Sequence, residues 1–369
     1  MTFFTGQARI WKSKFDVCAI SADKPWLEEF GKAEGIRTHH IPMERDISLW
    51  KDFYCLILFI VFFIKERPEV VHGNTPKGAL LSMLAAWLTR RPVRIYMCHG
   101  LRYEGFSGRF RRLLMFMEKL TCRCATQVIT VSNSAREVLI ADGICDDKKV
   151  KVVGYGSLGI DLTHYTVDND ETHIAELRKK YGVKTSDFVY LFVGRLVRDK
   201  GLVELVNAFQ RMADSHPDAH LVIVGGKLSG ENDSIPDSLF QVIEDHPQIT
   251  YVGRQSDVRP FFTLSNVFVL PSYREGLSIV LIEAGAMGRP AITCNVTGCK
   301  DIIDNGENGW VIPSHSEDAL YAAMAEAYDY PERLAELGNT ARSVVRERYE
   351  QQKVWQAYWD EYKRLANEQ

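Results

Sequence analysis

Two glutamates, Glu275 and Glu283, are separated by seven residues, all of which are apolar or glycine except Ser278. A capping box would need its acidic residue three positions after Ser278, where the chain has Leu281, so Glu283 does not cap a helix. A buried carboxylate without partners costs roughly several kcal/mol. Glu283 therefore requires hydrogen-bond donors, which come either from the protein or from a ligand.

The elements predicted around these glutamates are a strand, a loop and a helix. Residues 266–271 form a short apolar run that ends in proline, which indicates a buried strand. Residues 278–287 are apolar nearly all round, which predicts a buried helix. Glu275 precedes this helix, and Glu283 lies in its second turn.

A basic turn upstream also joins a predicted strand to a predicted helix. It lies within residues 193–209 and carries Arg195, Arg198 and Lys200. The helix begins near Lys200, and the free N–H groups and the dipole of a helix N-terminus favour an anion. The turn is therefore a candidate phosphate site, although ordinary loop chemistry also explains it.

The turn after Glu275 offers backbone donors for the same anion, the N–H groups of Gly276, Leu277, Ser278 and Ile279. Both turns follow strands of one predicted sheet, which favours a shared anion over two unrelated loops. Neither turn contains the P-loop pattern G-x-x-x-x-G-K-[ST].

A nucleotide whose phosphates lie on these turns would satisfy Glu283. Its ribose diol can donate two hydrogen bonds to one carboxylate. Glu275, at the exposed lip of the turn, would then face the group attached to the diphosphate.

Strand-like and helix-like segments alternate in two blocks of this 369-residue chain. Residues 155–170, rich in Gly and Asp, are predicted as the linker between the blocks. Short apolar strands alternating with helices indicate parallel sheets, and hence two doubly wound α/β domains that bind ligands beyond the carboxyl ends of their strands. The predicted strands are 15–21, 36–42, 69–72, 93–98, 127–131 and 150–154, then 188–194, 219–226, 249–253, 266–271, 290–294 and 309–313.

The two halves of the chain differ in charge. Residues 1–160 hold 24 Lys and Arg against 16 Asp and Glu, a formal charge of +8, and the remainder carries −11. A basic first half favours an anionic surface or substrate there, although its Arg-rich run at 102–123 is also explained by a solvated helix face.

An apolar run at residues 55–64 is too short to cross a bilayer. It is predicted as a buried helix or as a helix lying at a membrane surface. The eight cysteines form no zinc-like set, so we expect reduced, mostly buried thiols. Residues 1–14 lack the apolar core of a secretory signal, which favours a cytoplasmic location.

Several motifs resemble retaining glycosyltransferase family 4. GRLVRDKG, followed by P-S-x-x-E-G-L-S-I-V-L-I-E-A, is similar to its C-terminal domain with the E-x7-E motif, and GWVIP after DIIDNGENG fits the same pattern. EVVHGNTPKGALLSMLAAWL, MCHGLRYEG, EKLTCRCATQVITVS and GIDLTHY resemble the bacterial polysaccharide members. The resemblance covers nearly the whole chain. The E-x7-E motif alone would be a weak sign of the family, but its occurrence downstream of GRLVRDKG at this separation is a strong one.

The resemblance implies a GT-B fold, in which two Rossmann-like domains face a cleft and the last helix crosses back to the first domain. Residues 1–160 would form the acceptor-side domain and 161–348 the nucleotide-sugar-binding domain. Residues 349–369 would form the returning helix.

The resemblance also implies roles for individual residues. Arg195 and Lys200 would hold the diphosphate, Glu283 the ribose and Glu275 the donor-sugar hydroxyls, while His99 matches the histidine that approaches the donor sugar. His99 is also explained as a satisfied residue at a strand end. No metal and no cofactor are expected beyond the donor, usually a UDP-sugar, because Arg, Lys and helix dipoles can stabilise the departing diphosphate.

The expected function is retaining sugar transfer to a glycan or a polyprenyl-diphosphate-linked acceptor in surface polysaccharide synthesis. The enzyme would be cytoplasmic and peripheral at the inner membrane face, on an anionic surface, without a nucleic-acid partner. A soluble acceptor stays open. The alternatives are an enzyme like the UDP-N-acetylglucosamine 2-epimerases and a non-catalytic nucleotide-sugar-binding subunit.

The beginning of the chain departs from the family pattern. Family members usually start with a strand and a Gly-containing loop, whereas here a helix is expected within residues 3–13 and the first predicted strand is 15–21. We therefore expect the first domain to lack its central first strand, and its sheet to carry a gap.

Overall fold

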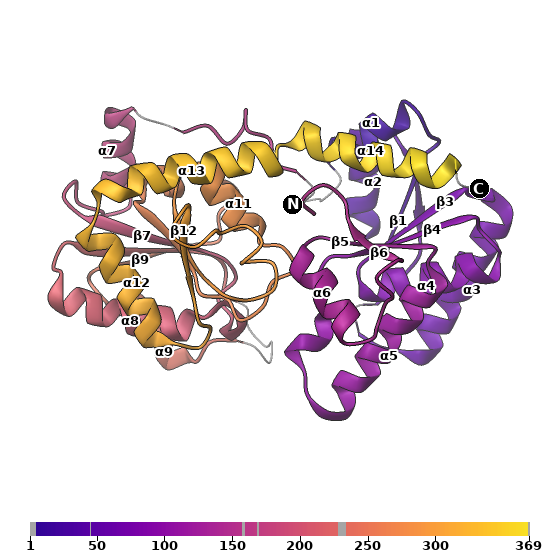
Figure 1. The fold of residues 1–369 in the computed structure, drawn as a ribbon, viewed down its shortest axis with the longest axis horizontal. Helices are drawn as coiled ribbons and strands as arrows, with labels where there is room; N and C mark the ends of the chain where they lie inside the picture. Colours follow the sequence, from indigo (N-terminus) through magenta and orange to yellow (C-terminus); the bar gives the residue numbers. More distant parts are fainter. Residues whose placement is uncertain (1–4, 45, 157–158, 168–169, 228–233, 368–369) are drawn as a thin grey trace. The chain divides into compact units, whose positions relative to one another are not determined.

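The computed structural model describes residues 5–44, 46–156, 159–167, 170–227 and 234–367. The chain divides into two compact units (Figure 1). Unit 1 comprises Met1–Leu158 and Val354–Gln369, and unit 2 comprises Gly159–Lys353. The sequence predicted these divisions at 160/161 and 348/349. The ends of unit 2 extend further because they pair with each other: Ile160 N–H donates to Tyr349 O at 2.8 Å, and Gln351 N–H donates to Ile160 O at 3.0 Å.

Unit 2 contains a six-stranded parallel sheet in the order β12-β11-β10-β7-β8-β9. Its strands are almost wholly buried apolar runs, as expected for a sheet covered on both faces. The strands are β7 (Phe188–Val193), β8 (Ala219–Val224), β9 (Ile249–Gly253), β10 (Val267–Leu270), β11 (Ala291–Cys294) and β12 (Gly309–Ile312). The helices are α7 (Glu171–Lys180), η2 (Arg198–Lys200), α8 (Leu202–Ser215), α9 (Asp237–Asp245), α10 (Arg259–Leu264), α11 (Ile279–Ala286), α12 (Glu317–Asp329) and α13 (Glu332–Arg348).

Unit 1 contains two separate parallel sheets, β1-β2 and β3-β4-β5-β6. The strands are β1 (Cys18–Ser21), β2 (Arg37–His40), β3 (Val70–Asn74), β4 (Val93–Cys98), β5 (Gln127–Thr130) and β6 (Val150–Val152). The helices are α1 (Gln7–Lys12), α2 (Lys24–Glu34), α3 (Leu49–Glu66), α4 (Pro76–Leu88), η1 (Arg102–Gly105), α5 (Gly108–Cys124), α6 (Asn133–Ala141) and α14 (Gln351–Asn367).

The start of unit 1 is helical where a helix was expected. Helix α1 occupies Gln7–Lys12, and within the described residues no strand precedes β1. Residues 1–4, which the expected helix also touched, lie outside the described part of the chain.

The last helix, α14, belongs to unit 1 from Val354 onward, and its side chains contact residues of that unit. The hydroxyl of Tyr362 lies 2.7 Å from Nδ1 of His72 on β3, and the ring of Tyr362 packs edge-on against Trp11 of α1. Lys151 of β6 pairs with Glu361 at 3.0 Å. The chain thus returns to its first unit at its end, as expected.

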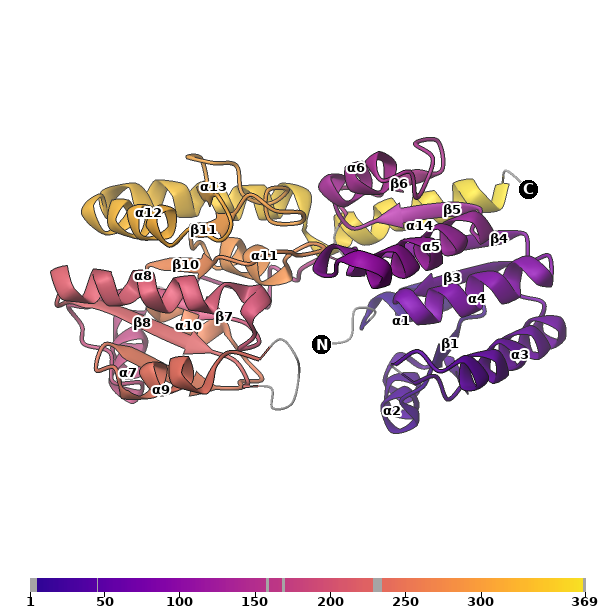
Figure 2. The ribbon, with the colours of Figure 1, turned by 90° about the horizontal axis from the view of Figure 1, so that it is seen from below.

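Helices α3, α4 and α5 lie side by side along one face of the unit 1 strands (Figure 2). Helix α3 contains the apolar run 55–64, but it is not a buried helix on all sides: only Cys55, Phe59 and Phe63 are buried. The buried-helix prediction is therefore wrong for its outer face. Periodicity could not show this, because every residue of the run is apolar.

The thiols are as expected. All eight cysteines are free, and all but Cys18 are buried.

Candidate active site

The two turns singled out from the sequence meet at one point of the unit 2 sheet. The strand order reverses between β7 and β10, which are direct neighbours, with Tyr190 opposite Val267. The basic turn follows β7, and the loop that carries Glu275 follows β10. In open parallel sheets, ligands bind beyond the carboxyl ends of the strands where the strand order reverses.

A glycine brings these turns into direct contact. Gly201 has φ +68° at the start of α8, and a Cβ there would lie 2.1 Å from the carbonyl oxygen of Pro271. A side chain would clash with backbone, so only glycine permits this approach. The amide of Tyr273 donates to the carbonyl of Asp199 at 2.9 Å, and the guanidinium of Arg274 donates to the Asp199 carboxylate at 2.6 Å. The turns therefore form one structure.

Lys200 and Glu275, predicted to hold the diphosphate and the sugar, are ion-paired with each other. Ser272 also donates to Oε1 of Glu275, at 3.0 Å. Both charged side chains keep a minor part of their surface exposed. Glu275 is thus fixed beside a cation at the lip of the site, and Arg195, two residues after β7, is exposed on the same turn.

The N-terminus of α11 lies against a third loop, which follows β11. Gly298, with φ +74°, lies so close that a Cβ would be 2.3 Å from the carbonyl oxygen of Gly276. The N–H of Ser278, one of the predicted phosphate donors, donates to Gly298 O at 3.3 Å. The hydroxyl of Ser278 is buried and has no hydrogen-bond partner among the described residues.

Glu283 lies on α11 and is 8% exposed. The hydroxyl of Tyr165 donates to its Oε1 at 2.6 Å, so the protein supplies one donor for the buried carboxylate. Burial raises the pKa of Glu283 above the usual carboxyl value; the Tyr165 hydrogen bond opposes this shift, and the nearby charge of Asp257 adds to it.

The segment around Tyr165 is held in place from both sides. Arg342 of α13 donates to the carbonyl oxygen of Tyr165 at 3.2 Å, and also to that of Ala286. Arg259 donates to the carbonyl oxygen of His164 at 2.9 Å and pairs with Asp257. Residues distant in the chain, Arg342 and Arg259, therefore fix the backbone that positions the Tyr165 hydroxyl.

His99 lies in unit 1, directly after β4. Its Nε2 is 2.9 Å from Oδ1 of Asn74, the last residue of the adjacent strand β3. Burial lowers the pKa of His99 to about 4, so its ring is neutral near pH 7. A neutral imidazole can donate or accept a hydrogen bond but adds no charge.

Sequence reasoning missed Tyr165, Asn74 and Ser272. Asn74 and His99 end neighbouring parallel strands, so the strand order could have revealed their pairing. Tyr165 stands 118 positions before Glu283, in a segment without periodicity, and no local signal could have found it.

Two family models match the chain. Residues 9–157 match "Glycosyltransferase Family 4", and residues 173–344 match "Glycosyl transferases group 1". Over 360 residues, the chain is 35% identical to the capsular polysaccharide biosynthesis glycosyltransferase CapM of Staphylococcus aureus, an alignment that covers 97% of this chain and 92% of that protein. The chain is a family 4 glycosyltransferase.

A second curated relative of this glycosyltransferase is more distant. The UDP-Gal:alpha-D-GlcNAc-diphosphoundecaprenol alpha-1,3-galactosyltransferase of Escherichia coli is 26% identical over 323 residues, covering 86% of this chain and 81% of that protein.

Solved structures confirm the predicted GT-B fold of this glycosyltransferase. Anabaena HepE in complex with UDP superposes with a TM-score of 0.81 at 19% identity, covering 98% of this chain and 95% of that one. Sucrose-phosphate synthase from Thermosynechococcus elongatus gives a TM-score of 0.78 at 21% identity, covering 98% and 92%. At these identities, the likeness concerns the fold.

Proposed function

We propose that this glycosyltransferase moves a sugar from a UDP-sugar, with retention of anomeric configuration, to a polyprenyl-diphosphate-linked glycan during surface polysaccharide synthesis. The observation that carries the proposal is the junction of the two turns after β7 and β10. There Lys200, Glu275 and the N-terminus of α11 meet where the strand order reverses. This junction offers an anion site next to a carboxylate that can accept sugar hydroxyl groups.

The relatives support the acceptor class. CapM of Staphylococcus aureus is named for capsular polysaccharide biosynthesis, and the Escherichia coli relative is named as acting on a diphosphoundecaprenol-linked sugar. A Campylobacter jejuni relative, 26% identical over 303 residues, is likewise named as transferring N-acetylgalactosamine to a diphospho-undecaprenol-linked sugar. A lipid-linked acceptor would place the enzyme at the cytoplasmic face of the membrane as a peripheral protein.

We assign the donor contacts as follows. Arg195 and Lys200 bind the diphosphate, together with backbone at the N-terminus of α11. Glu283 accepts hydrogen bonds from the ribose through the oxygen that Tyr165 does not use. Glu275 accepts them from the donor-sugar hydroxyls. A diphosphate bound at Lys200 would compete with Glu275 for its ammonium group, and this would free Glu275 to bind the sugar.

The chemistry follows from these contacts. The bond between the anomeric carbon and the β-phosphate oxygen breaks, and the acceptor oxygen bonds to the same face of that carbon. The leaving phosphate oxygen takes the acceptor proton. Negative charge grows on the departing diphosphate, so Arg195, Lys200 and the helix dipole stabilise the transition state more than the ground state. Glu275, committed to remote hydroxyls, is not the nucleophile. His99, neutral and oriented by Asn74, serves as a hydrogen-bonding group to the donor sugar.

The test is a mass-resolved assay with a panel of nucleotide sugars and a short lipid-linked acceptor. Transfer of one sugar from a UDP-linked donor, lost in Glu275→Gln, is the expected result. An α-linked product from an α-linked donor would establish retention.

The same assay decides between the alternatives. Interconversion of UDP-sugars without an acceptor would indicate an epimerase, and saturable UDP-sugar binding without turnover would indicate a binding subunit. Efficient transfer to soluble glycans alone would correct the acceptor assignment.

A further inference from the structure

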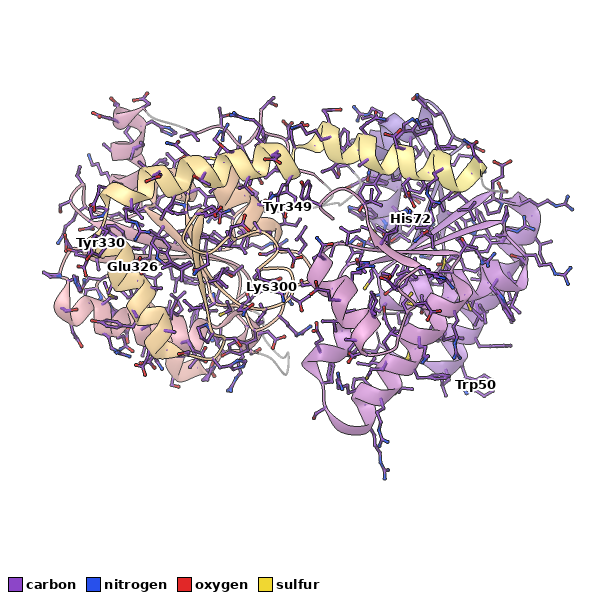
Figure 3. All side chains as sticks on the ribbon, in the orientation of Figure 1. Trp50, His72, Lys300, Glu326, Tyr330 and Tyr349 are labelled. Atoms are coloured by element: carbon purple, nitrogen blue, oxygen red, sulfur yellow. The ribbon has the colours of Figure 1, made fainter. Side chains whose placement is uncertain are left out.

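Helix α3 exposes a continuous apolar stripe along its outer face. Trp50 is 86% exposed and projects away from the ribbon (Figure 3). Val61 and Ile64, at the other end of the helix, are 57% and 58% exposed. Phe53, Tyr54 and Ile57 complete the stripe. The stripe runs the length of an 18-residue helix, about 27 Å at 1.5 Å per residue.

The two units differ sharply in such exposure. In the described part of the chain, nineteen large apolar side chains are exposed, of which eighteen belong to unit 1 and only Tyr330 to unit 2. Isolated exposed apolar residues are normal, whereas a contiguous patch indicates a binding surface. Unit 2 thus serves as an internal reference for how little apolar exposure this chain otherwise has.

The exposed positions of α3 hold no acidic residue. Its two acids, Asp52 and Glu66, are only partly exposed and are both engaged, Asp52 with Lys77 at 2.7 Å and Glu66 with Arg37 at 2.8 Å. The helix therefore offers solvent an apolar surface with Lys51 near one end and Lys65 at the other. Lys51 in turn pairs with Glu44.

Helix α5 continues the pattern with added positive charge. Its exposed face combines Phe110, Leu113 and Phe116 with Arg109 and Arg112. No ion pair of the described chain uses either of these arginines. The only acid of α5, Glu118, is buried. Apolar and cationic side chains thus interleave without an anion.

These faces belong to one layer of unit 1. Helix α4 packs against α3 on one side and against α5 on the other (Figure 2). The Asp52–Lys77 pair joins the first turns of α3 and α4. The first turns of α4 and α5 follow the carboxyl ends of β3 and β4, where Asn74 and His99 lie. The surface therefore extends to the edge of the unit 1 sheet at which Asn74 and His99 lie.

We propose that the exposed faces of α3 and α5 bind the interface of an anionic lipid bilayer, with α3 lying along the surface and its stripe among the head groups and upper acyl chains. Arg109 and Arg112 contact lipid phosphates. The proposal names the surface through which the peripheral enzyme of the proposed function would bind the membrane. It rests on the proposed function only for the reason why the chain binds a membrane. No helix in the described chain is both long and apolar enough to span a membrane, so binding is interfacial.

The composition favours lipid over a second copy of this chain. Aromatic and aliphatic side chains with cations and no acids match an anionic interface, where Trp and Tyr are favoured. Two copies joined through this surface would place like-charged arginines in the same contact without acids to neutralise them, which is unfavourable.

The experiment is co-sedimentation of the full chain with vesicles, without donor or acceptor. We expect binding to phosphatidylcholine vesicles that contain phosphatidylglycerol, weakening as salt is added, and little binding to phosphatidylcholine alone. Trp50→Ser and Val61→Ser should each lower the partition coefficient roughly tenfold, because each removes an apolar side chain that the bilayer would bury. Arg109→Glu with Arg112→Glu should abolish the preference for phosphatidylglycerol.

Unit 2 provides matched controls. Tyr330→Ser removes an apolar side chain that is 52% exposed, and Lys179→Glu reverses an exposed charge on α7; both should bind vesicles like wild type. Brominated lipids should quench wild-type fluorescence more than that of Trp50→Phe, since Trp50 is one of seven tryptophans. Equal vesicle binding by Trp50→Ser and Tyr330→Ser would overturn the proposal. The proposal would also be overturned if the chain did not bind vesicles and instead formed a dimer that Trp50→Ser dissociates.

Transfer to a detergent-solubilised acceptor separates this proposal from the proposed function. A chain that transfers sugar but does not bind vesicles would refute the membrane surface alone. A chain that binds vesicles through α3 but transfers no sugar would refute the function alone.

Discussion

The hydroxyl of Tyr165 donates a hydrogen bond to Oε1 of Glu283 at 2.6 Å, across 118 positions of the chain. The buried carboxylate of Glu283 needs hydrogen-bond donors, and Tyr165 satisfies one of its two oxygens. It supplies one protein donor and favours the ionised carboxylate, while burial and Asp257 favour the protonated form. In the balance, the pKa of Glu283 is raised.

Replacing Tyr165 with phenylalanine should weaken UDP binding and change its pH dependence. Loss of the hydroxyl removes the one contact that lowers the pKa of Glu283, so the pKa rises further. Ribose hydroxyls donate to the ionised form, so UDP affinity should fall on acidification, and the fall should begin at higher pH in Tyr165→Phe. At neutral pH we expect a loss of at most roughly tenfold, because the hydroxyl contacts Glu283 and not the nucleotide; calorimetry provides the measurement.

Tyr190→Phe is the matched control for this prediction. The buried hydroxyl of Tyr190 donates to Met324 O at 2.7 Å in the same unit, away from the two turns. Its loss should lower stability without moving the pH profile of UDP binding. Identical profiles for wild type and Tyr165→Phe would show that the hydroxyl does not act on the nucleotide site.

The two glutamates should separate binding from turnover. Glu283→Ala should weaken UDP binding by roughly tenfold or more, the value of a charge-assisted hydrogen bond of about 1.5–3 kcal/mol. Glu275→Ala should not weaken UDP binding, because UDP lacks the sugar that Glu275 binds, but it should cut turnover. Calorimetry with UDP and the mass-resolved transfer assay measure the two effects. Wild-type UDP affinity in a folded Glu283→Ala protein would remove the ribose assignment.

Arg195→Ala and Lys200→Ala should each lower kcat more than they raise KM, since charge on the diphosphate grows as it departs. Arg198→Ala is a control from the same turn. The guanidinium of Arg198 donates to Ser234 O at 3.3 Å, so loss of this side chain should change kcat little. Steady-state kinetics with the best donor provide the measurement. A raised KM with unchanged kcat would mean that the cations bind the ground state only.

Transfer should persist in a chelator. The expected leaving-group stabilisation comes from Arg195, Lys200 and the N-terminus of α11, none of which needs a divalent ion. Rates with and without EDTA, after dialysis, measure this directly. Strict dependence on added magnesium or manganese would show that the cations and the helix dipole are insufficient.

The parts of this site that the sequence could predict share one cause. Residues near Lys200 and Glu275 follow short apolar strands, and parallel strands bring such turns to one edge of a sheet. Alternation along the chain therefore sufficed to place both turns together. The direct pairing of Lys200 with Glu275 needs the side-by-side order of β7 and β10, which alternation does not supply.

The parts that escaped prediction depend on tertiary packing. Tyr165 reaches Glu283 because Arg342 and Arg259 hold its backbone from distant elements, and nothing local in GIDLTHY encodes that contact. The outer face of α3 was hidden for a different reason. A run without polar residues has no polar side to mark its exposure, so the sequence cannot tell a buried helix from one with a free apolar stripe.

The last prediction concerns the attachment of α14 to unit 1 in acid. His72 Nδ1 accepts a hydrogen bond from Tyr362 of α14, and burial, with a smaller contribution from His99, lowers the pKa of His72 to about 3. An unfolded histidine has a pKa of about 6.5. A depressed folded pKa means that the neutral ring stabilises the fold above about pH 6.5. This stabilisation is lost as the pH falls toward the folded value, by up to about 1.4 kcal/mol per pH unit.

His72→Gln should blunt this loss. A glutamine can accept the Tyr362 hydroxyl but does not titrate, and the other acid-sensitive groups of unit 1 are unchanged. Hydrogen exchange of residues 354–367 in wild type and variant, compared at the same pH, isolates the contribution of His72. We expect similar protection at about pH 7.5 and faster exchange of the wild-type helix at about pH 5. A wild-type-to-variant ratio that stays constant between these pH values would show that protonation of His72 does not control the docking of α14.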